Sequence, residues 1–123
     1  MEFKDLVGKV LVSIENKNRE LILTTNDGQQ YEQYHSQDCC EGVEVEDICG
    51  DVSDVLNSPI LVAEEVTSNK NPPDVKKEYQ DSFTWTFYKL ETAKGGITIR
   101  WYGESNGYYS EEVSFRCIQD ANN

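Results

Sequence analysis

Side chains alternate with a period of two residues through the last third of the chain. The segment SFTWTFYKLET, residues 82 to 92, places Phe83, Trp85 and Phe87 on one side, and threonines with Tyr88 on the other. A period of two is the spacing of a β-strand, and aromatic and β-branched residues suit a pleated, half-buried surface. Lys-Gly-Gly at 94 to 96 then turns the chain, ITIRWYG returns it, ESNG turns it again and YYSEEVSFRCI completes the run. These segments predict a three-stranded antiparallel meander.

The first two thirds of the chain show the same period in shorter pieces. GKVLVSIEN, residues 8 to 16, predicts a strand with valines and Ile14 on one face and Leu11 and Ser13 on the other. RELILTT and QQYEQYHS flank Asn-Asp-Gly at 26 to 28, which tolerates the positive φ of a hairpin turn. GVEVEDICGD, residues 42 to 51, directs its valines to one face and its glutamates to the other. A further strand is expected to start at Ile60.

The connections complete the predicted fold. Asp51 is placed to cap a short helical turn in VSDVLN, and residues 68–78 contain Pro-Pro, which cannot donate to a ladder, so they predict a surface loop. We expect one mainly β domain over residues 1–123: a single antiparallel sheet, or a small barrel or sandwich, of six to eight strands with one or two short helical turns. Residues 118–123 are expected to form a tail.

The apolar segments are short. None approaches the roughly 20 residues that a membrane span needs. The first sixteen residues carry charges inside their apolar stretch and lack a small-residue cleavage site, unlike a signal peptide. We therefore expect a cytoplasmic protein that does not associate with membranes, and free thiols on its four cysteines.

The negative charge is concentrated in one stretch. The net charge is −12, and the residues between Arg19 and Lys70 include twelve acids and no Lys or Arg. The other eleven acids are matched by eleven bases, so this stretch supplies the whole excess. Such a surface repels polyanions and speeds encounter with basic surfaces. The charge therefore predicts a basic partner and no direct binding to nucleic acid. The simpler alternative is that the charge only keeps the protein in solution.

Three cysteines and the single histidine lie close to the acids. Candidate metal ligands are His35, Cys39 and Cys49, with Cys40 or Cys117 as a fourth. No two cysteines have the spacing of two to four residues that zinc fingers favour, and neighbouring acids would raise a thiol pKa rather than lower it. We interpret the cysteines as buried structural residues, and expect no metal and no cofactor.

No enzyme motif stands out in the sequence. It has one histidine, no nucleophile elbow, no phosphate-binding loop and no glycine-rich dinucleotide turn, and the calcium loop of an EF-hand is also missing. The sequence therefore favours a protein that binds without catalysis.

A second candidate surface is the stretch IRWYGESNGYYSEE, residues 99 to 112. Arg100 lies among aromatic residues, and its planar fork suits carboxylate or phosphate. As a ligand pocket this stretch would use Arg100, Tyr102, Asn106, Tyr108 and Tyr109. The alternative is a hairpin whose Asn-Gly turn is required by geometry, whose aromatic residues fill the core and whose arginine pairs with an acid.

Four motifs carry a resemblance. DCCE at 38 to 41, SPILVAEEV at 58 to 66, TWTFYKL at 84 to 90 and TIRWYGESNGYYSEEV at 98 to 113 resemble a family of short proteins encoded by phages and prophages. The likeness covers roughly residues 7 to 115 and transfers no mechanism. It implies a small accessory protein made inside a bacterial host cell, a class that often inhibits host defence by occupancy.

Three functions follow from these features as hypotheses. The first is an acidic, DNA-mimic-like anti-defence inhibitor that covers a basic surface of a host nuclease or CRISPR effector. Its charge would come from Glu44, Glu46, Asp47, Asp51 and Asp54, with Tyr31 and Tyr34 as anchors. The second is a sponge for a small signalling nucleotide at Arg100, and the third is a phage structural protein or one that forms a homo-oligomer. The charge favours the first, because an anionic nucleotide is repelled by the protein.

Overall fold

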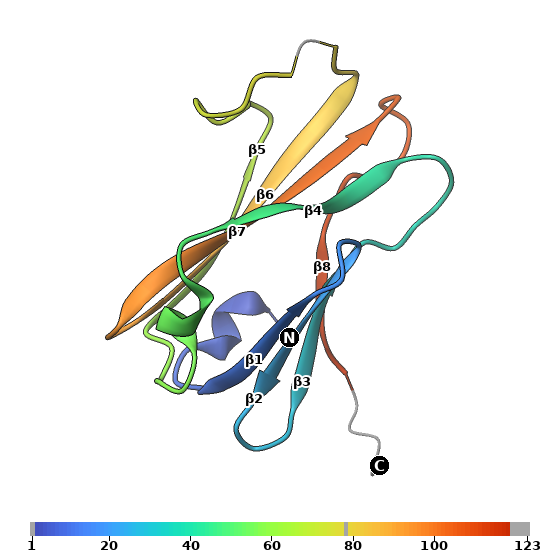
Figure 1. The fold of residues 1–123 in the computed structure, drawn as a ribbon. Helices are drawn as coiled ribbons and strands as arrows, with labels where there is room; N and C mark the ends of the chain where they lie inside the picture. Colours follow the sequence, from blue (N-terminus) through green and yellow to red (C-terminus); the bar gives the residue numbers. More distant parts are fainter. Residues whose placement is uncertain (1, 78, 119–123) are drawn as a thin grey trace.

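The computed structural model describes residues 2–77 and 79–118. They form eight strands in two antiparallel sheets of four, together with two short 3₁₀ helices (Figure 1). The first sheet has the order β1(Leu11–Asn16), β2(Glu20–Thr25), β3(Gln30–Tyr34), β8(Ser114–Ile118). The second has the order β4(Gly42–Cys49), β7(Gly95–Ser105), β6(Ser82–Thr92), β5(Val62–Ser68). The helices are η1(Phe3–Leu6) and η2(Val52–Val55). The predicted mainly β fold is confirmed, as two open sheets and not as a closed barrel in the described part of the chain.

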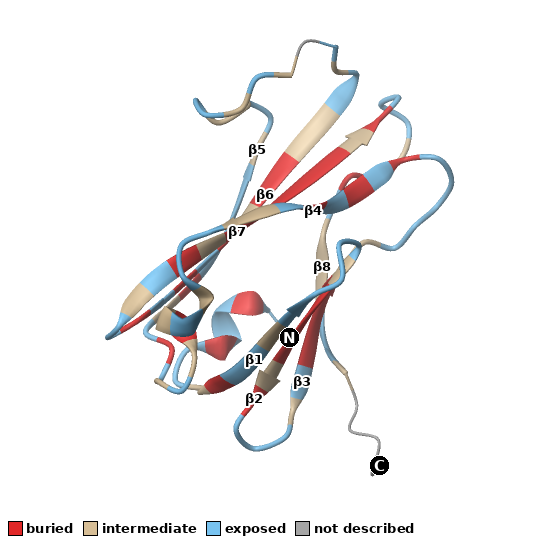
Figure 2. Ribbon diagram, in the orientation of Figure 1, coloured by how far each residue is buried: buried red, intermediate tan, exposed pale blue. Residues whose placement is uncertain are grey.

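One core joins the two sheets. Leu21 and Leu23 of β2 and Ile99 and Trp101 of β7 are fully buried in it, and Figure 2 shows buried stretches along β2, β3, β6 and β7. Trp101 donates its indole Nε1–H to Oε1 of Gln33 on β3 at 2.8 Å, a buried hydrogen bond between the sheets. A buried indole needs such a partner, because an unpaired donor is costly away from water.

The predicted turns are present. β2 and β3 pair antiparallel around the expected turn, where Gly28 has a φ of 86°. Asp51 accepts a hydrogen bond from the backbone N–H of Ser53 at 3.0 Å, and it is the residue that caps η2. These local signals were sufficient because turn and cap residues act on their own backbone.

Some strand details differ from the prediction. Leu11 is fully buried whereas Val12 is 41% exposed, because the pairing of β1 with β2 shifts between Leu11 and Ser13. The strand expected from Ile60 begins at Val62 as β5, and Ile118, expected in the tail, is the last residue of β8. The rest of the expected tail, residues 119–123, lies outside the described residues.

Both faces of β6 are covered. Tyr88 and Leu90 point into the shared core, while Trp85 on the opposite face is also fully buried. The cover consists of residues 69–77 and 79–81, here called the strap, which contain most of the predicted surface loop. Asn71 of the strap accepts the indole N–H of Trp85 at 2.9 Å, and Gln80 donates to the Tyr102 hydroxyl at 2.6 Å. The loop is therefore at the surface, but it also packs against the sheet.

None of the helices in residues 2–77 and 79–118 combines the length and the apolarity needed to cross a lipid bilayer.

Candidate functional site

A pocket lined by carboxylates lies at the start of β4, between the segment 36–42 and the turn after β7. Its volume is about 380 Å³. Four parts of the chain supply its lining, which holds three acids and no Lys or Arg: Cys40, Glu41, Gly42, Asp81, Glu104, Ser105, Asn106 and Tyr109. The structure therefore brings part of the acidic stretch together with part of the predicted aromatic turn.

The first wall of the pocket is held by Glu41, whose side chain is fully buried. Its carboxylate lies 2.7 Å from Nε2 of His35 and accepts the backbone N–H groups of Asp38 and Cys39, each at 2.9 Å. The hydrogen bond with His35, followed by those from the backbone, lowers the pKa of Glu41 to about 2. Nδ1 of His35 lies 2.6 Å from the carbonyl oxygen of Glu112. Both ring nitrogens of His35 therefore face an oxygen atom, which fixes the orientation of the ring.

The second wall is held by Glu111, which is also buried. Its carboxylate accepts the hydroxyl of Thr84 at 2.8 Å and that of Ser105 at 2.5 Å. Ser105 in turn accepts the backbone N–H of Gly107 at 2.9 Å, which closes the turn. Gly103 of β7 has no Cβ, and one added there would lie only 2.8 Å from the carbonyl oxygen of Glu111. The segment that contains Glu111 therefore lies directly against β7. Glu41 and Glu111 thus shape the pocket, but their carboxylates are buried in the protein and do not face solvent.

The charge that reaches solvent at the pocket comes from other residues. Asp81 is exposed and Glu104 is half-buried, with Oε1 of Glu104 accepting the Tyr102 hydroxyl at 2.6 Å. Burial, and then the hydrogen bond to Glu104, raises the pKa of Tyr102 to about 12. Tyr109 is half-buried, its ring edge-on to Tyr108 at 5.0 Å between centroids. Carboxylates beside an aromatic ring form a receptor for a lysine or arginine side chain.

The five acids predicted to bind a partner do not form one patch. Glu44 and Glu46 are exposed on β4, as the alternation predicts, but Glu46 lies 3.5 Å from Nζ of Lys77. Asp47 is paired with Arg100, and Asp51 caps η2. Asp51 and Asp54 come after the far end of β4, a strand that spans about 25 Å at a rise of about 3.3 Å per residue, so they lie away from the pocket. Glu44 is the member of the set that is exposed near the pocket.

Arg100 is held by two carboxylates. Its Nε and Nη2 lie 2.6 and 2.5 Å from the oxygens of Asp47, and its Nη1 and Nη2 lie 3.0 and 2.9 Å from those of Asp74 on the strap. These hydrogen bonds, first to Asp47 and then to Asp74, raise the pKa of Arg100. The interpretation of Arg100 as the partner of an acid is confirmed. Arg100 and Tyr102 lie beneath the strap, apart from the exposed Asn106 and Tyr108.

The two tyrosines expected as anchors belong to the first sheet. Tyr31 is a core residue, 3% exposed, and its ring stacks on Phe115 at 5.9 Å. Tyr34 is half-buried, and the guanidinium of Arg116 lies 4.5 Å from its ring centroid. Tyr31 therefore stabilises the fold and is not available to a partner.

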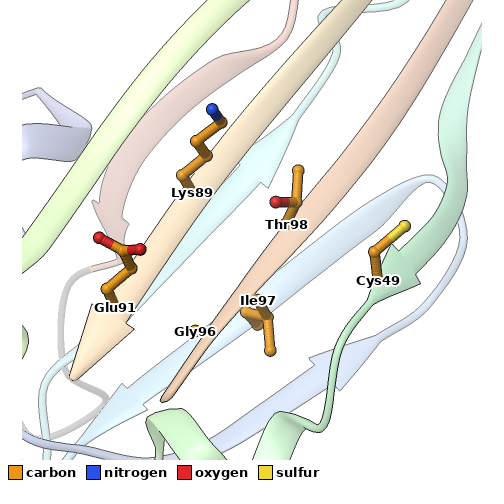
Figure 3. Close-up of a pocket in the computed structure, with 6 residues that line it drawn as sticks. All are labelled: Cys49, Lys89, Glu91, Gly96, Ile97 and Thr98. Carbon is orange, nitrogen blue, oxygen red and sulfur yellow. The ribbon is translucent and has the colours of Figure 1, made fainter. Parts of the chain in front are cut away.

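The candidate metal ligands lie apart. Cys39 precedes β4 and is joined to Cys40 by a disulfide, so the expectation of free thiols was wrong for this pair. The expectation of buried cysteines was also wrong, because all four are exposed. Cys49 is the last residue of β4, and its thiol is free and exposed. It lines a second pocket, which has a volume of about 340 Å³. Figure 3 shows this pocket, with Thr98 between Cys49 and Lys89. Within the described residues, no three His, Cys, Asp or Glu side chains are arranged to hold a metal ion.

Sequence reasoning missed Asp81, Glu104 and the pairing of His35 with Glu41. The available signals were an acid beside the Ser-Asn-Gly turn and a lone histidine six residues before a glutamate. Neither signal has a spacing that identifies its partner, because the contacts join separate segments.

The chain was compared with known proteins. No curated protein and no solved structure matches it. The sequence model of one family matches residues 4–115, which is most of the chain. The protein therefore belongs to the family described as Domain of unknown function (DUF7448).

Proposed function

We propose that the protein acts by binding, as an acidic inhibitor of a bacterial antiviral defence component such as a nuclease or a CRISPR effector. The observation that carries the proposal is the pocket at the start of β4, whose lining includes Asp81 and Glu104 and no Lys or Arg. Exposed Glu44 and Asp38 lie in the adjoining segments of the chain. In this proposal the protein is a small accessory protein of phage origin.

The pocket offers an anchor for a basic side chain of the target. An arginine or lysine that enters it meets the carboxylates of Asp81 and Glu104 and the ring of Tyr109. A guanidinium binds a carboxylate at two points, which adds geometric specificity to the attraction. Such buried, charge-paired anchors supply much of the free energy of many interfaces.

The net charge of −12 supplies the longer-range part of the attraction to the target. It speeds the encounter with a basic, nucleic-acid-binding surface and repels the nucleic acid itself. The bound inhibitor therefore competes with nucleic acid for the same surface of the target. No bond is made or broken in this mechanism.

The geometry gives less support to a nucleotide sponge at Arg100. Asp47 and Asp74 already occupy the guanidinium, and the strap covers the neighbouring aromatic side chains. A phosphate would have to displace Asp74 and overcome the negative field of the protein. A nucleotide that raises the melting temperature, with loss of the effect in Arg100→Ala, would favour the sponge instead.

The test is affinity capture with the full-length protein as bait in a bacterial lysate. The bait is compared with Glu44→Lys/Asp81→Lys and with the matched control Glu15→Lys/Glu91→Lys, whose sites are exposed and lie away from the pocket. The expected result is a basic, nucleic-acid-binding protein that is retained by the wild type and the control and lost from the first variant. Its nucleic-acid cleavage or binding is expected to fall when the wild-type protein is added. Equal retention by both variants would contradict the proposal.

A further inference from the structure

The strand β5, at one edge of the second sheet, has a regular backbone. β5 pairs with β6 over seven consecutive residues without a register shift, and it is the last strand of its sheet. The opposite edge, β4, has a bulge between Val45 and Asp47, and the N–H of Val45 donates to the carbonyl oxygen of Asn18 at 2.7 Å. β1, an edge of the first sheet, also has a register shift. Natural proteins shield sheet edges with such devices, and β5 has no register shift of this kind.

A groove runs beside this edge. Its volume is about 500 Å³, and it is lined by Ala63 to Val66 of β5 and by Glu2, Phe3 and Lys4 at η1. η1 packs against β5, and its Phe3 is anchored by contact with Tyr88, at 4.7 Å between ring centroids. One side of the groove is therefore strand backbone and the other is a fixed helical turn. This shape suits an extended peptide.

The charges at the groove select its occupant. Glu64 and Glu65 are both exposed, and as neighbours on a strand they point to opposite faces of the sheet. Glu2 adds a third carboxylate, and the one base in the lining, Lys4, is paired with it at 3.1 Å. Val66, 44% exposed, offers an apolar contact beside these charges. A second copy of the chain would bring the same glutamates together, whereas a basic strand would meet opposite charges on both faces.

We propose that the β5 edge binds an extended, lysine- or arginine-rich segment of a partner protein, which adds to the second sheet as a fifth strand. Main-chain hydrogen bonds to β5 supply affinity, and basic side chains at Glu64 and Glu65 supply specificity. This surface lies on the opposite edge of the sheet from the pocket at the start of β4. It is independent of the proposed function and either can fail alone.

The experiment titrates the full-length, isotope-labelled protein with the peptide Val-Lys-Lys-Val-Lys-Lys-Val, whose adjacent lysines point to both faces of an extended strand. The backbone amides of the protein are followed by NMR. Two peptides serve as controls: one with glutamate in place of lysine, and one with the basic sequence but N-methyl groups on every internal peptide bond, which removes the donors from both edges of the peptide. The N-methylated peptide keeps the charge and cannot complete a ladder. The protein variants are Glu64→Lys/Glu65→Lys, and Glu15→Lys/Glu112→Lys as a control with the same change in charge at exposed sites outside β5 and its neighbours.

The expected result is a set of amide shifts concentrated in residues 62–68, produced by the basic peptide alone. Binding should weaken by about tenfold or more in Glu64→Lys/Glu65→Lys, since two attractive pairs become repulsive, and should be retained in the control variant. Three outcomes would overturn the proposal: no shifts at β5 with millimolar peptide, equal binding of the N-methylated peptide, or shifts spread over acids elsewhere. Shifts confined to Asp81, Glu104 and Asn106 would also overturn it, while supporting the pocket of the proposed function.

Discussion

Arg100 on β7 and Asp47 on β4 face each other across the two strands, joined at two points by bonds of 2.6 and 2.5 Å. The pair forms because the bulge between Val45 and Asp47 shifts the register by one residue and brings the two side chains to one face. The same guanidinium then binds Asp74, which fastens the strap to the sheet. One arginine therefore connects three segments, and its role is structural.

The first prediction concerns this connection. Arg100→Met removes the cation and leaves Asp47 and Asp74 without it, and we expect the free energy of unfolding to fall by about 2 kcal/mol. Asp74→Asn should cost less than Arg100→Met, because the Asp74 side chain is 63% exposed and solvent screens its interaction with the guanidinium. Urea denaturation measures both values, and the fluorescence of Trp85 reports whether the strap has opened. Equal losses in the two variants would contradict the central place of Arg100.

The second prediction concerns acid. The pKa of Glu41 is lowered from 4.5 to about 2 in the folded protein, so the unfolded chain takes up its proton at the higher pH. Glu41 therefore contributes stability that is fully present above about pH 4.5 and is lost as the pH falls towards 2. Glu41→Gln should be less stable than the wild type at neutral pH, and the difference should shrink across this window. Thermal melts of both proteins over this pH range provide the measurement, and a constant difference would rule out the account.

The third prediction concerns the hydrogen bond between the sheets. Trp101→Phe leaves Oε1 of Gln33 buried without its donor, and Gln33→Met leaves the indole N–H without its acceptor. Each variant should lose about 1 to 3 kcal/mol of unfolding free energy. The double variant should lose less than the sum of the two, because it removes both unpaired groups. Additive losses would mean that the bond does not stabilise the fold.

The strands and turns could be predicted from the sequence because their signals are local. The alternation around Trp85 marks β6. Asp51 marks the start of the helical turn η2, which it caps. The burial of both faces of β6 could not be predicted, because it depends on a hydrogen bond between Asn71 of the strap and Trp85 of β6. The bulge that shifts Asp47 onto Arg100 leaves no mark in the alternation of residues 42–51.

The candidate site was predicted only in part for the same reason. The charge excess of residues 20–69 is visible in the sequence, but its division into buried and exposed acids is not. Glu41 and Glu111 turn inward because His35, Ser105 and Thr84 reach them from other segments. Asp81, the last residue of the strap, joins the pocket from a segment distant in the sequence.

The central claim is that acids at the start of β4 bind a basic partner surface. Its most direct test is the dissociation constant for the captured partner, measured by isothermal titration calorimetry from low to high salt. We expect affinity to fall steeply with salt, and Glu44→Lys/Asp81→Lys to weaken binding by about tenfold or more, while Glu15→Lys/Glu91→Lys binds like the wild type at each salt concentration. An affinity that is independent of salt, or an equal loss in both variants, would contradict the account.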